Sequence, residues 1–129
     1  MTPDDALLER VRELGGFDTP REAEIALRAT LAGLGEALHE NDRLAVADAL
    51  PDRFVTTVCM RRDLGSFDVD VLVERVGLRE GVAPGFALEH AQAACRALGE
   101  VLPDDLVHRL DGVLPPAFAG LFHRVSKPE

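Results

Sequence analysis

The chain has 129 residues, of which 47% are hydrophobic and 29% are charged. These proportions are typical of a folded globular protein, and the length allows one ordinary domain. The formal net charge is −9, and acids outnumber bases in both halves, by 13 to 8 in residues 1–64 and by 10 to 6 in residues 65–129. Nucleic acids and anionic membranes require a positive surface, so the composition argues against both as partners.

The two cysteines, Cys59 and Cys95, indicate no disulfide framework, and we expect reduced thiols in a cytoplasmic protein. Residues 1–5 are acidic and lack the basic region and apolar run of a signal peptide. No stretch approaches the roughly 18 apolar residues that a membrane span needs.

Three sequence patterns occur twice in the same order, which predicts a tandem repeat of a unit of roughly 60 residues. Leu-Glu-Arg-Val at 8–11 returns as Val-Glu-Arg-Val at 73–76, an offset of 65 positions. Gly-Glu-Ala-Leu at 35–38 returns as Gly-Glu-Val-Leu at 99–102, and Leu50-Pro51 with Phe54 returns as Leu114-Pro115 with Phe118, each offset by 64.

The first copy is predicted to contain four helices. Apolar spacing predicts one over 5–14, ended by Gly15 and Gly16. A capping box from Thr19 to Glu22 opens a long helix that reaches about residue 39. Asn41 is expected to cap a third helix to about 49, and Pro51 opens a fourth that ends near Cys59.

The second copy repeats this order after a linker at 61–66. Helices are predicted over 69–78 and 84–102, from Pro103 onward, and over 115–123, followed by a tail at 125–129. The two long helices carry matching apolar stripes with identical spacing, 64 positions apart. Their members are Ala23, Leu27, Thr30, Leu31, Leu34 and Leu38, and Ala87, Ala91, Ala94, Cys95, Leu98 and Leu102.

We therefore predict an all-α fold of eight helices in two pseudo-symmetric four-helix repeats that share one core, within a single domain over 1–129. Repeat one covers about 5–60 and repeat two about 67–124. The β-prone segment 53–59 is predicted helical because its counterpart follows the same Leu-Pro start. Gly33, Gly35 and Gly99 lie inside predicted helices, where glycine costs about 0.5–1 kcal/mol relative to alanine, so we expect close helix crossings there.

Four residues are candidates for a site at the seam between the repeats. Glu36 and Glu100 recur at equivalent places and, if they meet near a pseudo-twofold axis, could share a proton or bind a cation. The alternative is that each is an exposed glutamate near a helix end. Cys59 and His123 also occupy equivalent positions, 64 apart, although the chain offers no closely spaced ligand pair of the kind zinc sites use.

The repeated pair Glu9-Arg10 and Glu74-Arg75 has two interpretations. Adjacent helical residues do not face each other, so both side chains of each pair could be solvated. Alternatively, they form salt bridges to another helix or to a partner protein.

The repeated segments resemble the bacterial family catalogued as domain of unknown function 2267. The resemblance lies in residues 26–38, rich in alanine, leucine and arginine, and in Ala-Asp-Ala-Leu-Pro at 47–51. It implies an all-helical repeat in a small bacterial cytoplasmic protein and carries no catalytic or binding residue onto this chain. Thr-Thr-Val-Cys-Met at 56–60 departs from the family pattern, which tends towards aromatic residues and an aspartate- or tryptophan-containing turn.

The sequence favours a non-enzymatic helical protein-interaction module that binds another protein or itself and uses no cofactor. The alternative hypothesis is a small ligand or metal held at the seam by Glu36, Glu100, Cys59 or His123. A symmetric homodimer is compatible with the repeat. An enzyme is the least favoured class, because spacing alone indicates no catalytic arrangement.

Overall fold

The computed structural model describes residues 2–59, 84–113 and the single positions 74, 77, 81 and 122. These residues contain six helices and no strand, which confirms the all-α prediction. The count of eight is not reproduced: the predicted helices over 69–78 and 115–123 fall almost entirely outside the described ranges. The six are α1 (Pro3–Gly15), α2 (Pro20–Ala37), α3 (Glu40–Ala49), α4 (Asp52–Cys59), α6 (Pro84–Val101) and α7 (Asp104–Val113).

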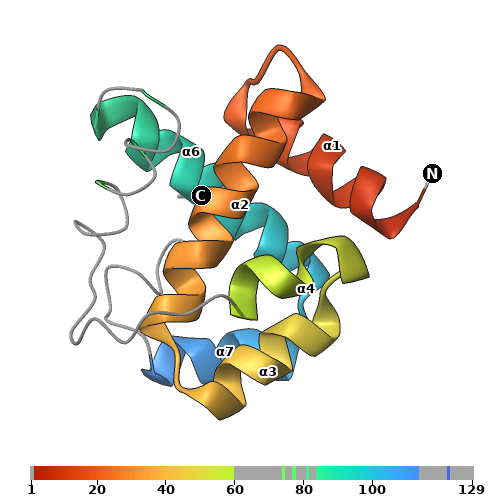
Figure 1. Cartoon of the computed structure of the whole chain (residues 1–129), viewed down its shortest axis with the longest axis vertical. Coiled ribbons are helices and arrows are strands. Elements are labelled where there is room, and N and C mark those ends of the chain that lie inside the picture. Colours follow the sequence, from red (N-terminus) through yellow and green to blue (C-terminus); the bar gives the residue numbers. More distant parts are fainter. Residues whose placement is uncertain are drawn as a thin grey trace, which may run out of the picture.

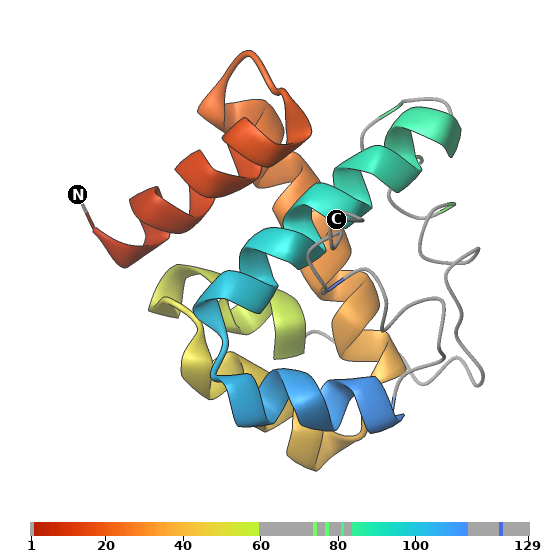
Figure 2. The ribbon, with the colours of Figure 1, turned by 180° about the vertical axis from the view of Figure 1, so that it is seen from behind.

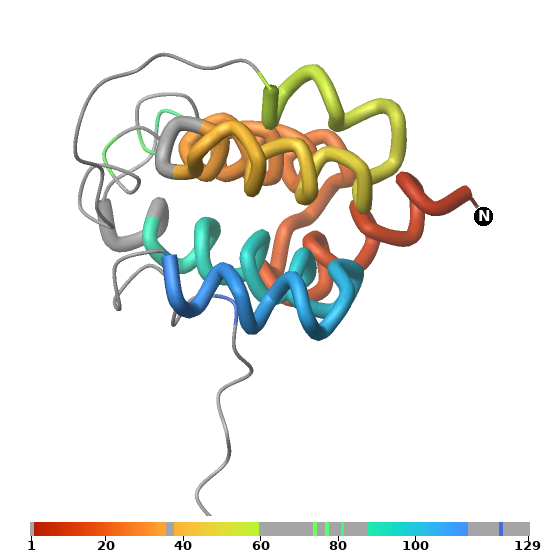
Figure 3. Tube along the Cα trace, turned by 90° about the horizontal axis from the view of Figure 1, so that it is seen from below, coloured from red at the N-terminus to blue at the C-terminus, as the bar shows by residue number. Residues whose placement is uncertain are grey.

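The helices form two layers (Figure 3). Helices α2, α3 and α4 lie in one layer, and α6 and α7 lie in the other. The long helices α2 and α6 cross at the centre of the molecule, and α1 packs against both of them (Figures 1 and 2). Helix α3 lies beside α7 at the end of the molecule away from the N-terminal end of α2.

The first two helices begin at hydroxyl caps. The Thr2 hydroxyl accepts the Asp5 N–H at 3.2 Å, so α1 starts two residues before its predicted position. The Thr19 hydroxyl accepts the Glu22 N–H at 3.2 Å, which confirms the predicted start of α2. Gly16 ends α1 with a φ of 68°, a left-handed conformation that glycine adopts without steric penalty.

The predicted cap at Asn41 is wrong, because α3 already begins at Glu40 with His39 in the cap position. Helix α2 ends at Ala37, two residues earlier than predicted, and Leu38 is extended. The physical reason is Arg43, whose guanidinium donates to the carbonyl oxygens of Gly35 at 2.8 Å and Leu38 at 2.7 Å. These bonds satisfy carbonyls that a longer α2 would have bonded to its own backbone.

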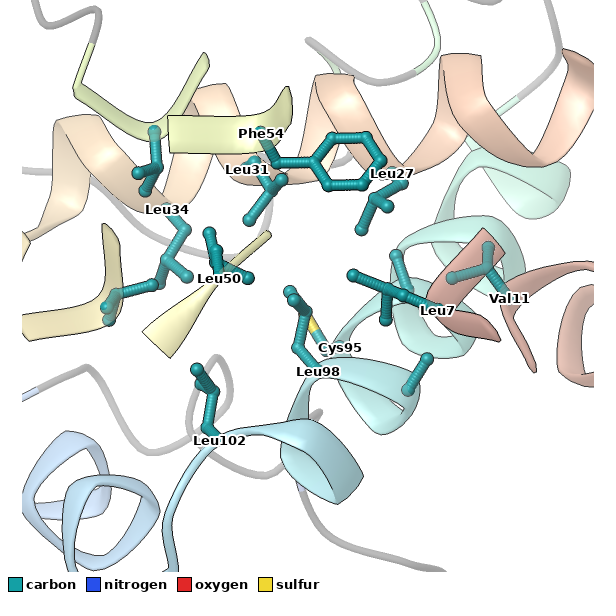
Figure 4. Packing of buried hydrophobic residues seen from close by; sticks show 14 of the residues in the cluster. Leu7, Val11, Leu27, Leu31, Leu34, Leu50, Phe54, Cys95, Leu98 and Leu102 are labelled. Carbon is teal, nitrogen blue, oxygen red and sulfur yellow. The ribbon is translucent and has the colours of Figure 1, made fainter. Parts of the chain in front are cut away.

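A single buried core joins the two layers (Figure 4). All six stripe residues of α2 are buried, as are the five described stripe residues of α6 from Ala91 to Leu102. Leu7 and Val11 of α1 enter the same core beside Leu27 and Cys95. The β-prone segment is helical as predicted, because as α4 it places Phe54 and Val58, one turn apart, in this core.

The close approach expected at Gly35 and Gly99 is present. A Cβ on Gly35 would stand 2.0 Å from the carbonyl oxygen of Val58, and a Cβ on Gly99 would stand 2.5 Å from that of Phe122. Both distances are far below van der Waals contact, and the obstacle is backbone in each case. The two glycines are 64 positions apart, and so are the two carbonyls they meet.

We expect Gly35→Ala to destabilise the protein, since α4 must move away from α2 to admit the methyl group. Overpacking of this kind costs typically about 1–3 kcal/mol. Gly112→Ala in α7 is the matched control, because nothing lies within 4 Å of a Cβ there, and it should be neutral or stabilising by up to about 1 kcal/mol. Urea unfolding of both variants measures the difference, and equal stabilities would contradict the close contact.

Candidate functional site

The predicted candidate Glu100 lies near the end of α6 and forms an ion pair with Arg10 of α1. Arg10 Nε donates to Glu100 Oε1 at 2.7 Å, and Nη2 donates to Oε2 at 2.9 Å. This two-pronged contact links α1 to α6, as the salt-bridge interpretation of the Glu9-Arg10 pair anticipated. The glutamate raises the pKa of Arg10 above its ordinary value by hydrogen bonding, so the guanidinium is cationic at any physiological pH.

The other seam hypotheses stay untested predictions. The side chain of Glu36 and the whole of His123 lie outside the described residues. The structure therefore does not test whether Glu36 approaches Glu100 or whether Cys59 approaches His123. Within the described ranges, no group of three or more His, Cys, Asp or Glu residues lies close enough to hold a metal ion.

The two cysteines occupy different environments. Cys95 is fully buried in the core, where desolvation raises the pKa of its thiol far above the ordinary value. Cys59, at the end of α4, is half-buried and lines a hollow that opens to solvent. A raised pKa suppresses the thiolate, the reactive form, so Cys95 is a core residue as the sequence indicated.

We expect a disulfide reagent at neutral pH to modify Cys59 in the folded protein and to leave Cys95 unmodified. Unfolding in denaturant should make both thiols reactive, because burial is what protects Cys95. Mass spectrometry of the labelled protein counts the modified thiols, and Cys59→Ser provides the control. Rapid labelling of Cys95 in the native state would contradict the packing around it.

The ion pair between Arg10 and Glu100 is exposed enough for solvent to screen it, since 42% of the Arg10 side chain is accessible. We therefore expect Glu100→Gln to lower the free energy of unfolding by less than about 1 kcal/mol. The double variant Arg10→Glu with Glu100→Arg should recover part of that loss. Thermal unfolding of the single and double variants measures the coupling, and a larger loss without recovery would point to another role for Glu100.

One open part of the described surface is centred on α3. Leu44 is 53% exposed, and a hollow lies on each flank of the helix. One hollow, of about 560 Å³, lies between α3 and α4, and the other, of about 370 Å³, lies between α3 and α7. Ala45 and Asp48 line both hollows. We call Leu44, Asp48 and the residues lining these two hollows the α3 surface.

Arg43 fixes α3 relative to the end of α2. Its side chain is only 5% exposed, and its two bonds reach the last carbonyls of α2 from the first turn of α3. A cation at a helix C-terminus also interacts favourably with the helix dipole. The buried guanidinium therefore holds the turn between the two helices in one geometry.

A second contact fixes α3 relative to α7. Arg109 Nε lies 2.6 Å from Oδ1 of Asp42, whose side chain is 6% exposed. The two atoms are not aligned as a hydrogen bond, so attraction between the charges holds the contact. The charge of Arg109 is thereby used within the fold, at the edge of the hollow between α3 and α7.

Several charged residues away from the α3 surface neutralise one another. Arg28 Nε donates to Glu24 at 2.8 Å, and Nη1 donates to the Thr57 hydroxyl at 2.8 Å. Arg53 reaches both Glu24 and Asp4, which ties α4 to α2 and α1. This network is explained by the packing of the helices and needs no ligand.

Sequence reasoning missed the α3 surface. The buried residues of this segment are Asp42, Arg43, Val46, Ala47 and Leu50. From Arg43 onward their spacing of 0, 3, 4 and 7 marks the core face. Leu44 is an apolar residue outside that face, and this is the signal that could have identified the α3 surface. The short helix also carries several alanines, however, and these blur the apolar pattern.

The described residues thus define a two-layer bundle with one shared core and an open surface over one short helix. The chain belongs to the family described as uncharacterised conserved protein, domain of unknown function 2267, whose model matches residues 4–121. This confirms the resemblance found in the sequence. No curated protein matches the chain. Among the described helices, none combines the length and apolar composition that crossing a membrane requires.

Proposed function

We propose that the protein is a non-enzymatic protein-interaction module and that its partner docks on the α3 surface. The observation that carries the proposal is the exposed Leu44, which lines the hollow between α3 and α4, with a second hollow on the α7 side of the same helix. Interfaces are typically anchored by a few apolar side chains that enter neighbouring depressions. Leu44 offers an apolar side chain to a depression on the partner, and the hollows offer depressions to apolar side chains of the partner.

The framework around α3 supports the same conclusion. Arg43 holds the helix to α2, and Asp42 holds it to α7 through Arg109. A surface held in one geometry loses little conformational freedom on binding, so more of the contact energy appears as affinity. The contacts of Arg43 and Asp42 give the α3 surface this advantage.

A tandem repeat is part of the proposal. Helices α2 and α6 begin and end 64 positions apart, and so do α3 and α7. The backbone contacts of Gly35 and Gly99 share that offset. These correspondences support two copies of one helical unit packed about a pseudo-twofold axis, as the sequence predicted.

We further propose a bacterial cytoplasmic location and a protein partner, with no binding to nucleic acid or membranes. Both cysteines are free thiols, which a reducing compartment maintains. The net charge of −9 would repel phosphate backbones and anionic lipid. The partner is another protein or a second copy of the chain.

We expect Leu44→Glu to abolish partner binding while leaving the fold intact, because it places a charge where the partner would bury an apolar group. Native mass spectrometry of protein purified gently from its own cells reports the bound species. The wild type should carry a stoichiometric protein, and the variant should lose it.

Ile25→Glu on α2 is the matched control, since Ile25 is also an exposed apolar residue, at 38%, but lies outside the α3 surface. It should retain the partner. A wild-type protein that instead carries a small species of defined mass would overturn the proposal in favour of a ligand at the seam. If both variants lost the partner equally, the result would indicate that the docking site is not specific to the α3 surface.

A further inference from the structure

We propose that the α3 surface receives a basic segment of another protein, one that contacts Leu44 through an apolar side chain and the surrounding aspartates through flanking lysines or arginines. This inference rests on the proposed function and adds the chemistry of the partner. It follows from which charges at the α3 surface are already neutralised and which are not.

The hollow between α3 and α4 has acidic side chains and no basic ones among its lining residues. Asp48 and Asp52 are both exposed there, beside the apolar side chains of Leu44 and Val55. An apolar floor with an acidic rim favours a segment that carries an apolar side chain next to cationic groups.

The hollow between α3 and α7 is also acidic in effect. It is lined by Asp48, Asp105 and Arg109. Arg109 is its one basic lining residue, and its guanidinium already lies against the buried carboxylate of Asp42. The two aspartates are therefore left as the uncompensated charges of this hollow.

The aspartates of the α3 surface differ from the acids that pair with arginines on the described helices. Glu24 is bonded to Arg28 and Arg53, and Glu9 is bonded to Arg12. Asp48, Asp52 and Asp105 form no side-chain hydrogen bond or ion pair within the described residues. Asp48 and Asp52 line the hollow of Leu44, and Asp105 lines the second hollow, so these charges leave a negative field that a cationic partner would relieve.

A second copy of the chain fits this surface poorly. Each copy carries a net charge of −9, so two acid-rimmed surfaces would repel each other. The position 64 residues after Leu44 is His108, so the second half of the chain does not offer the same apolar contact. A basic segment from another protein satisfies both the apolar and the charged groups.

The test uses two synthetic amphipathic peptides, one of leucine and lysine and the other of leucine and glutamate. Fluorescence anisotropy measures the affinity of each for the full chain. The lysine peptide should bind, and the glutamate peptide should not. The triple variant Asp48→Asn, Asp52→Asn and Asp105→Asn should weaken lysine-peptide binding by about tenfold, because it removes three exposed ion pairs with the peptide.

A second triple variant separates the local charges from the overall charge. Asp5→Asn, Asp18→Asn and Glu89→Gln remove the same number of exposed acids from outside the α3 surface. This variant should change the affinity by less than about twofold, because charges outside the α3 surface make no direct contact with the peptide and are screened by solvent and salt. Circular dichroism confirms that both variants fold.

Equal weakening by the two triple variants would overturn the inference, because overall charge would then explain the binding. Self-association of the wild type that Leu44→Glu abolishes would overturn it in favour of a second copy. A native partner that depends on Leu44 but not on the three aspartates would overturn the inference and leave the interaction module standing. A native partner whose binding does not depend on Leu44 would instead contradict the proposed function itself.

Discussion

The close contact between the backbone of α2 at Gly35 and the carbonyl of Val58 is the constraint on which the rest of the first layer depends. Only a residue without Cβ admits α4 at this distance. With α4 so close, Phe54 and Val58 reach the core and complete the layer formed by α2, α3 and α4. The equivalent contact at Gly99 brings the backbone of Phe122 against α6 in the same way.

The charged residues of the fold divide into those whose contacts position helices and those that leave charge at the surface. Arg43 fixes the turn from α2 to α3, and Arg10 joins α1 to α6. Asp42 and Arg109 join α3 to α7 across the two layers. Because these contacts consume their own charges, the aspartates that line the two hollows beside α3 remain without a basic partner among the described residues.

Sequence patterns predicted the apolar skeleton well because burial follows helical periodicity. The stripes of the two long helices are buried where described, and Thr19 and Gly16 mark helix ends as their chemistry requires. The end of α2 was predicted two residues too late, because it depends on bonds from Arg43 back to the carbonyls of Gly35 and Leu38. Local capping rules do not contain such bonds. The candidate Glu100 was identified as notable, but its pairing with Arg10, 90 positions away, was not indicated by spacing.

The sequence by itself determined the all-helical class, the stripes of the core and the positions where glycine permits close packing. Each of these depends on residues a few positions apart, whose relative placement the helix fixes. Tertiary structure alone decided which charges are neutralised and which remain available. That outcome depends on side chains brought together from different helices, as Asp42 meets Arg109, and no local pattern specifies such a meeting. The open surface over α3 exists for the same reason, because its hollows lie between helices.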